Sequence, residues 1–145
     1  MQNIFRKYGI TTRGLLSVTP RETYELVEKG AFILDLRETG YTDFKAFGVK
    51  QVVNVPISNF DDTIEQLDPD AYYILADASG LKTRQHAEKL LAKGFKHVAI
   101  MAGGFVEWER DGLPVYEDIN ERLSGACMCQ LKPRERKWQP AGNRH

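Results

Sequence analysis

The sequence predicts an α/β fold in which a parallel sheet of about five strands is packed between helices on both faces. Two observations lead to this prediction. Short apolar segments, typical of strands buried on both faces, recur along the chain at residues 31–34, 51–56, 71–76 and 97–100. Helical patterns alternate with these segments, and that alternation is typical of parallel strands joined by crossover helices.

The first helix is expected to begin after Thr19, which is a hydroxyl residue suited to the N-cap. Pro20 follows at the first helical position and Glu22 stands three residues after Thr19, so the segment carries a capping box. Gly30 is expected to end this helix. Residues 39–50 are expected to form a loop with room for one helical turn, and Asp68–Asp70 a turn. Further helices are predicted at residues 58–67, 83–93 and 105–110.

Composition excludes several classes of protein. The chain has 145 residues, of which 42% are hydrophobic, and its 20 basic residues balance 20 acidic ones. A disordered chain or a disulfide-rich scaffold is excluded, because the apolar fraction is that of a globular protein and there are only two cysteines. The neutral balance gives no reason to expect nucleic acid or an anionic membrane as partner. Without a signal-peptide or membrane-spanning pattern, a cytoplasmic protein with reduced thiols is expected.

The chain divides into three parts by composition. We expect an N-terminal extension at residues 1–15, one domain at residues 16–116 and a C-terminal tail at residues 117–145. Before residue 126 there are 15 basic and 19 acidic residues, whereas five basic residues and one acidic residue follow. The tail also holds both cysteines, so its chemistry is expected to differ from that of the domain.

Parallel sheets bind ligands beyond the carboxyl ends of their strands, so the loop that follows residues 71–76 is the first candidate site. At this loop and at four other places the chain resembles a rhodanese-like domain. The matching segments, which stand in the family's order, are Asp35–Glu38, Gly48–Pro56, Asp77–Thr83, Gly94–Trp108 and Leu113–Val115. The resemblance covers residues 16–116 and implies the rhodanese fold and a single-domain sulfurtransferase as relative. No cofactor or metal is expected, and the compactness of the chain favours a bacterial protein.

The resemblance also implies where the chemistry of the family would lie. In a rhodanese the loop begins with a cysteine that forms a persulfide, and inward-facing backbone N–H groups stabilise its thiolate. Asp77 stands at that position here, three residues before Gly80. Because a carboxylate cannot carry sulfane sulfur, the loop Asp77, Ala78, Ser79, Gly80, Leu81, Lys82 and Thr83 is expected to lack sulfurtransferase activity. The domain is then expected to act as a binding or regulatory module.

Other residues of the resemblance have supporting roles. Asp35 and Arg37 are expected to form an internal ion pair that supports the loop, since a buried arginine needs a carboxylate partner. Lys82 is placed to pair with Asp77, and Thr83 or Ser79 to cap the following helix. A simpler interpretation is that Asp77 itself is only a helix cap. Asp77 as a phosphorylated nucleophile is disfavoured, since the loop supplies no second carboxylate for a metal. His86 and His97 are expected at the surface or as caps.

Cys127 and Cys129 in the tail leave several hypotheses open. They are candidate thiols for accepting or relaying sulfur, which gives the alternative function of a thiosulfate or persulfide sulfurtransferase or a redox protein. They can also form a disulfide, supply half of a zinc site, or simply pack the tail onto the domain. Trp138 favours docking of the tail. The expected partner is an unknown protein or a small anionic ligand, with a homodimer as a further possibility.

Overall fold

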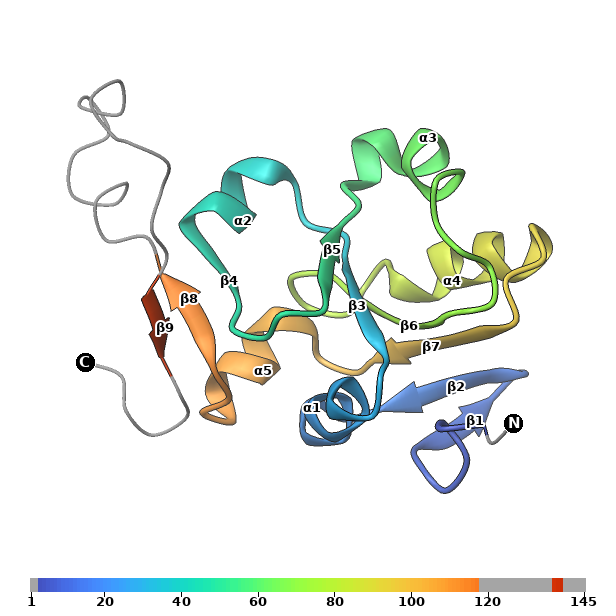
Figure 1. Cartoon of the computed structure of the whole chain (residues 1–145), viewed down its shortest axis with the longest axis horizontal. Helices are drawn as coiled ribbons and strands as arrows, with labels where there is room; N and C mark the ends of the chain where they lie inside the picture. Colours follow the sequence, from blue (N-terminus) through green and yellow to red (C-terminus); the bar gives the residue numbers. More distant parts are fainter. Residues whose placement is uncertain (1–2, 118–136, 140–145) are drawn as a thin grey trace.

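The computed structural model describes residues 3–117 and 137–139, which form two sheets and five α-helices (Figure 1). The larger sheet has six strands in the order β1-β2-β7-β6-β3-β5, and the smaller has the order β4-β8-β9. The elements are β1 (Ile10–Thr12), β2 (Leu15–Val18), α1 (Pro20–Glu28), β3 (Phe32–Asp35), α2 (Thr39–Phe44), β4 (Lys45–Phe47), β5 (Val52–Asn54), the 3-10 helix η1 (Ile57–Asn59), α3 (Phe60–Ile64), β6 (Tyr72–Ala76), α4 (Thr83–Ala92), β7 (His97–Met101), α5 (Gly104–Arg110), β8 (Val115–Glu117) and β9 (Lys137–Gln139).

The larger sheet confirms the predicted α/β class. Strands β2, β7, β6, β3 and β5 run parallel, and β1 adds an antiparallel edge next to β2. The sequence pattern located four of the parallel strands but not β2, where Leu15 and Val18 are buried but Leu16 and Ser17 are only partly covered. This mixed pattern differs from the continuous apolar runs of the inner strands, which is why periodicity missed it.

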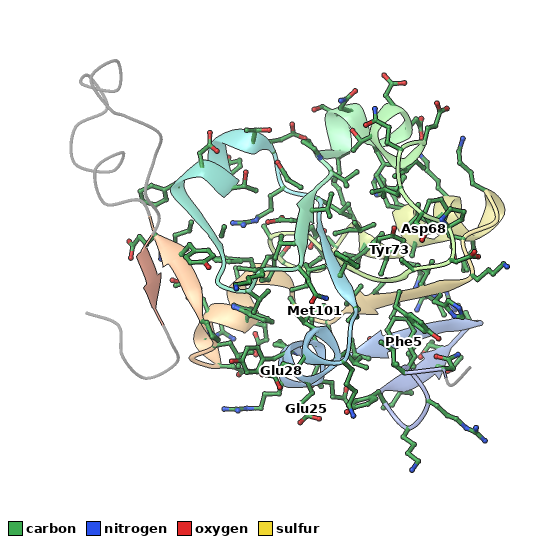
Figure 2. The ribbon with its side chains drawn as sticks, in the orientation of Figure 1. Phe5, Glu25, Glu28, Asp68, Tyr73 and Met101 are labelled. Carbon is green, nitrogen blue, oxygen red and sulfur yellow. The ribbon has the colours of Figure 1, made fainter. Side chains whose placement is uncertain are left out.

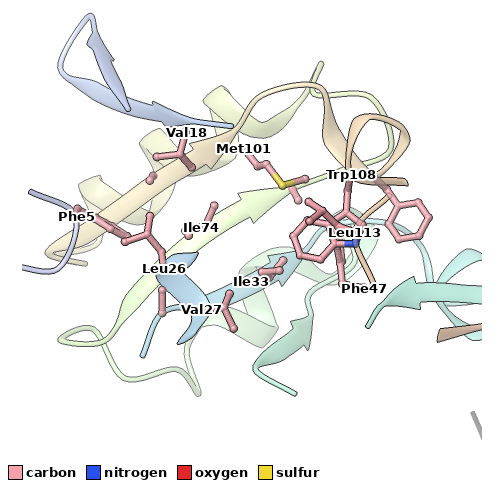
Figure 3. Packing of buried hydrophobic residues seen from close by; sticks show 14 of the residues in the cluster. Phe5, Val18, Leu26, Val27, Ile33, Phe47, Ile74, Met101, Trp108 and Leu113 are labelled. Carbon is pink, nitrogen blue, oxygen red and sulfur yellow. The ribbon is translucent and has the colours of Figure 1, made fainter. Parts of the chain in front are cut away.

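Two apolar cores cover the two faces of this sheet. Alternate residues of each strand point to opposite faces, so Ile33 and Ile74 belong to one core, whereas Leu34 and Leu75 belong to the other. The first core also takes side chains from α1 and α5, and the second takes them from α3 and α4. Figure 3 shows the first core, with Trp108 among its aromatic side chains. Helices therefore lie on both faces, as predicted.

Hydrogen bonds confirm the capping box predicted at the start of the first helix and the turn predicted at Asp68–Asp70. The Oγ1 of Thr19 accepts the N–H of Glu22 at 3.1 Å, and the Glu22 carboxylate accepts the N–H of Thr19 at 2.9 Å. Pro20 occupies the first helical position of α1. The predicted turn before β6 is also present, because the Asp68 carboxylate accepts the N–H of Asp70 at 2.9 Å.

Tyr73 in β6 links the turn at Asp68–Asp70 to the sheet (Figure 2). Its hydroxyl donates to the backbone carbonyl of Asp68 at 2.8 Å. Burial, and to a lesser degree the negative charge of Asp68, raises the pKa of Tyr73 above its ordinary value. The phenol therefore remains a hydrogen-bond donor throughout the neutral pH range.

Helix α2 and strand β4 take up most of residues 39–50, where a loop with room for one helical turn was expected. Helix α2 leads directly into β4, which pairs antiparallel with β8. Strand β9 of the C-terminal tail (Lys137–Gln139) also pairs antiparallel with β8, in the register Tyr116 to Trp138. Cys127 and Cys129 lie outside the described residues. Among the described helices, none has the length and hydropathy needed to cross a membrane.

A glycine turn joins β7 to α5 and sets the position of the neighbouring loop. Gly103 and Gly104 have φ angles of 79° and 64°, in the left-handed region that favours glycine. A Cβ on Gly104 would lie 2.5–2.6 Å from backbone atoms of Asp77, Ala78 and Ser79. Further along α5, the indole N–H of the fully buried Trp108 donates to the carbonyl of Pro114 at 2.7 Å.

The Gly104 contact gives a testable prediction. Gly104→Ala should lower the free energy of unfolding by about 2–5 kcal/mol, because it combines left-handed strain with an overlap against backbone that cannot yield. Gly112→Ala is the matched control, since Gly112 has a φ of 77° but open space around its Cα. The control should lose only about 1–2 kcal/mol. Urea denaturation measures both values, and equal losses would contradict the packing of the turn against the loop.

Candidate functional site

The candidate site lies at the carboxyl end of β6, where the chain passes through residues 77–82 into α4. Strands β3 and β7 flank β6 in parallel, so the segments that follow all three strands meet at one edge of the sheet (Figure 1). This is the edge at which parallel sheets bind ligands. The structure therefore brings the Asp35–Arg37 segment, the Asp77 loop and the Gly103–Gly104 turn together.

The carboxylate of Asp77 is the acceptor around which the loop is folded. The N–H of Ser79 donates to its Oδ1 at 3.1 Å, and the N–H of Gly80 donates to the same oxygen. The N–H of Lys82 donates to Oδ2 at 2.7 Å. Asp77 has only 7% of its surface exposed, so these charge-assisted bonds satisfy a buried negative charge. The inward-facing amides are thereby occupied by a residue of the chain itself.

Helix α5 explains why the loop amides face inward. The N–H of Phe105 donates to the carbonyl of Asp77 at 2.8 Å, and the N–H of Val106 donates to the carbonyl of Ala78 at 3.0 Å. These two carbonyls point toward the start of α5, while the N–H groups of the following residues turn toward the Asp77 carboxylate. The close approach of the two backbones requires the glycine turn before α5, and it holds the loop in one conformation.

Two expectations about the loop are corrected by these contacts. Helix α4 begins at Thr83, and its N-cap residue Lys82 makes no side-chain cap. The Thr83 hydroxyl bonds to the carbonyl of Gly80 at 3.5 Å instead, and Ser79 contributes its backbone N–H to Asp77. Lys82 reaches Asp77 through its backbone N–H, and within the described residues its ammonium forms no ion pair. The Asp77 carboxylate therefore accepts backbone N–H groups of the loop, and no side chain caps the first turn of α4.

Asp35 and Arg37 form the predicted internal ion pair. The guanidinium of Arg37 donates to both carboxylate oxygens of Asp35, at 3.0 and 2.8 Å, and both residues are buried. It also donates to the carbonyl of Lys45 at 3.0 Å and lies 4.0 Å from the centre of the Phe105 ring. Because Phe105 lies in the first turn of α5 and its N–H donates to Asp77, Arg37 links the segment after β3 to the helix that holds the loop.

The structure corrects the expectation for His86, which was placed at the surface or as a cap. His86 is buried with 3% of its surface exposed, and its ring packs edge-on against Phe60. Its Nδ1 lies 2.8 Å from the carbonyl of Lys82, which can only accept, so this nitrogen carries the proton. Through its bond to the carbonyl of Lys82, His86 thus holds the residue that precedes α4. His97 is partly covered and stacks on Tyr72.

A pocket of about 430 Å³ opens beside the loop. Its walls combine Asp77, Ala78, Ser79 and Lys82 with Arg37 and Glu38, and the rest of the lining is apolar or aromatic, from Leu36, Tyr41, Ile57, Leu81, Phe105 and Val106. Tyr41, Ile57 and Val106 could not be predicted as part of the site, because they lie on three separate elements. Only the topology brings them together, and no periodic pattern in the sequence marks them.

Comparison with known proteins agrees with this geometry. The sequence model of the rhodanese-like domain matches residues 19–111. The thiosulfate sulfurtransferase GlpE of Haemophilus influenzae is 31% identical over 101 residues, which cover 68% of this chain and 91% of that protein. GlpE of Actinobacillus pleuropneumoniae is 30% identical over 100 residues, with 68% and 90% covered.

Solved structures show the same fold. A rhodanese-related protein from Thermoplasma volcanium superposes with a TM-score of 0.62 at 27% identity, covering 68% of this chain and 95% of that one. The rhodanese-like domain of an Anabaena protein superposes with a TM-score of 0.63 at 22% identity, covering 82% and 92%. With its fold, its loop at the end of β6 and these relatives in agreement, the chain belongs to the rhodanese-like domain family.

Proposed function

We propose that this rhodanese-like domain does not transfer sulfur at the loop after β6 and acts instead as a binding or regulatory module. The observation that carries the proposal is the hydrogen bonding of Asp77, whose carboxylate accepts the N–H groups of Ser79, Gly80 and Lys82. In the family pattern, a cysteine begins this loop, and by the spacing to Gly80 its position falls on Asp77.

The chemistry of sulfur transfer explains why Asp77 matters. A thiolate attacks the outer sulfur of thiosulfate, the S–S bond breaks, sulfite leaves with the electron pair, and a persulfide remains on the enzyme. A carboxylate cannot form that persulfide. In addition, the Asp77 charge occupies the amides that would bind an anionic donor, and it repels such a donor at close range. The GlpE relatives are named thiosulfate sulfurtransferases. This chain would share their fold but would not transfer sulfur at the loop.

A second candidate function uses the tail thiols. Strand β9 pairs with β8 in the register Glu117 to Lys137. Glu117 is also paired with Lys45, whose carbonyl accepts from Arg37 beside the loop. Glu117 and Lys137, which stand on either side of Cys127 and Cys129 in the sequence, are thus paired in the sheet whose strand β4 accepts the bond from Arg37. This pairing favours, as the second candidate, a sulfurtransferase or redox protein that uses these thiols in place of a loop cysteine.

The first prediction concerns activity. The wild type should show no thiosulfate:cyanide turnover above a blank, whereas Asp77→Cys should gain turnover, because the loop amides are then free to stabilise a thiolate. Asp77→Ser is the matched control, since it removes the carboxylate without adding a thiol, and it should stay inactive. Thiocyanate formation measures all three. Turnover by the wild type that persists when Cys127 and Cys129 are both changed to serine would contradict the proposal.

The second prediction concerns stability. Asp77→Asn should lower the free energy of unfolding by about 1–3 kcal/mol, because the amide N–H₂ cannot accept the bond from Lys82 and a buried donor loses its partner. Asp62→Asn, on the exposed side of α3, is the control and should change it by less than about 0.5 kcal/mol. If urea denaturation gave Asp77→Asn the stability of the wild type, the carboxylate would not hold the loop.

The third prediction distinguishes the second candidate function. After exposure to thiosulfate, the intact protein should gain the mass of one sulfur atom if Cys127 or Cys129 accepts sulfane sulfur, and Cys127→Ser/Cys129→Ser should gain none. Mass spectrometry of the native chain measures the change. Thiols that stay unmodified and resist alkylation in the native state would exclude the tail as a site of sulfur or redox chemistry.

A further inference from the structure

The pocket beside the Asp77 loop has an apolar surface that is open to solvent. Five large hydrophobic side chains are exposed among the described residues, and three of them line this pocket: Tyr41, Leu81 and Val106. Tyr41 has 70% of its surface exposed and Leu81 has 84%. Single exposed apolar residues need no explanation, whereas a group of them around a concave site of about 430 Å³ favours a ligand with an apolar part.

Two carboxylates line the same pocket, and both keep their negative charge. The Glu38 carboxylate accepts the N–H and the hydroxyl of Ser58 at 3.1 and 2.7 Å, and the Asp77 carboxylate accepts the loop amides. These donors are neutral, so they hold the two carboxylates in position without cancelling their charge. An ionised carboxylate has about four acceptor positions, so both groups can accept a further hydrogen bond from a ligand.

The positive charges that line the pocket do not offset these two carboxylates. The guanidinium of Arg37 donates to both oxygens of Asp35, at 3.0 and 2.8 Å, so its charge is already matched by a buried carboxylate. Within the part of the chain that the structure describes, the Lys82 ammonium forms no ion pair that would fix it in the pocket. The charge that is held in place for a ligand is therefore negative.

On this basis we propose that the pocket binds a small primary amine with an aromatic or aliphatic body. The ammonium would be attracted by the carboxylates of Glu38 and Asp77, and the body would lie against Phe105 and Val106. The exposed ring of Tyr41 adds a π-face, which also attracts a cation. The inference rests on the proposed function, because the negative charge of Asp77 stands where the family pattern has the cysteine that attacks an anionic donor. It gives the binding module a class of ligand, a cation in place of an anion.

2-Phenylethylamine is the probe, and 2-phenylethanol, which has the same size and no charge, is the matched ligand. In ¹H–¹⁵N spectra of the full chain, the amine should cause saturable shifts at Leu81, Lys82 and Val106, with a dissociation constant on the order of millimolar. The alcohol should bind about two- to fivefold more weakly, which is the range of an exposed ion pair, and 3-phenylpropionate should bind more weakly still. Absence of saturable shifts, or an alcohol or carboxylate that binds as tightly as the amine, would overturn the proposal.

Two pairs of variants separate the charge of the pocket from its apolar surface. Glu38→Gln should reduce the preference for the amine over the alcohol by about 1.5- to 5-fold, whereas Glu28→Gln, the same change at the exposed end of α1, should leave that preference unchanged. Leu81→Ser should weaken binding of the amine and the alcohol alike, whereas Ile10→Ser, on the edge strand β1, should weaken neither. Equal effects within either pair would overturn the proposal, and so would weaker binding of the amine to Lys82→Gln.

A separate assay distinguishes failure of this inference from failure of the proposed function. The Cys127→Ser/Cys129→Ser chain is tested for thiocyanate formation and for binding of the amine and the alcohol. Turnover with the amine still preferred would overturn the proposed function and leave the amine site standing. Equal binding of the amine and the alcohol without turnover would overturn the amine site and leave the loss of sulfur transfer standing.

Discussion

A buried carboxylate with three amide donors determines the character of the site. Inward-facing N–H groups at the end of a strand form a concave site for an anion, and in this chain the anion is supplied by Asp77. The negative charge belongs to a side chain of the protein, so no bound ligand is needed to supply it. The loop is therefore folded around its own side chain, and the space that remains beside it is mainly apolar.

The rest of the fold holds this loop from three directions. The sheet places it at the end of β6, between the segments that follow β3 and β7. Helix α5 takes up the carbonyls of Asp77 and Ala78, and only glycine at position 104 permits that approach. Arg37 connects the segment after β3 to Phe105 of the same helix, while His86 holds the start of α4. Packing against the neighbouring elements thus supports the loop conformation that the Asp77 carboxylate stabilises from within.

Much of the fold follows from the sequence, because its strongest signals are local or periodic. The capping box at Thr19 and the apolar inner strands could be predicted from the sequence, and the Asp35–Arg37 pair followed from the need to neutralise a buried arginine. Strand β2 and the smaller sheet were missed, because short strands of mixed burial carry no clear period. His86 was misplaced since its burial depends on Phe60 from another helix. The pocket was missed for the same reason, as distant segments contribute Tyr41, Ile57 and Val106.

Amide hydrogen exchange at the loop tests the central claim most directly. The N–H groups of Ser79, Gly80 and Lys82 should exchange much more slowly than an unstructured peptide, because the buried Asp77 carboxylate accepts all three. The amide of the exposed Leu81, to which the structure gives no acceptor among the described residues, serves as the internal reference and should exchange fast. Exchange of the Ser79, Gly80 and Lys82 amides at the rate of the Leu81 reference would contradict the account, because the loop N–H groups would then be free for an anionic ligand.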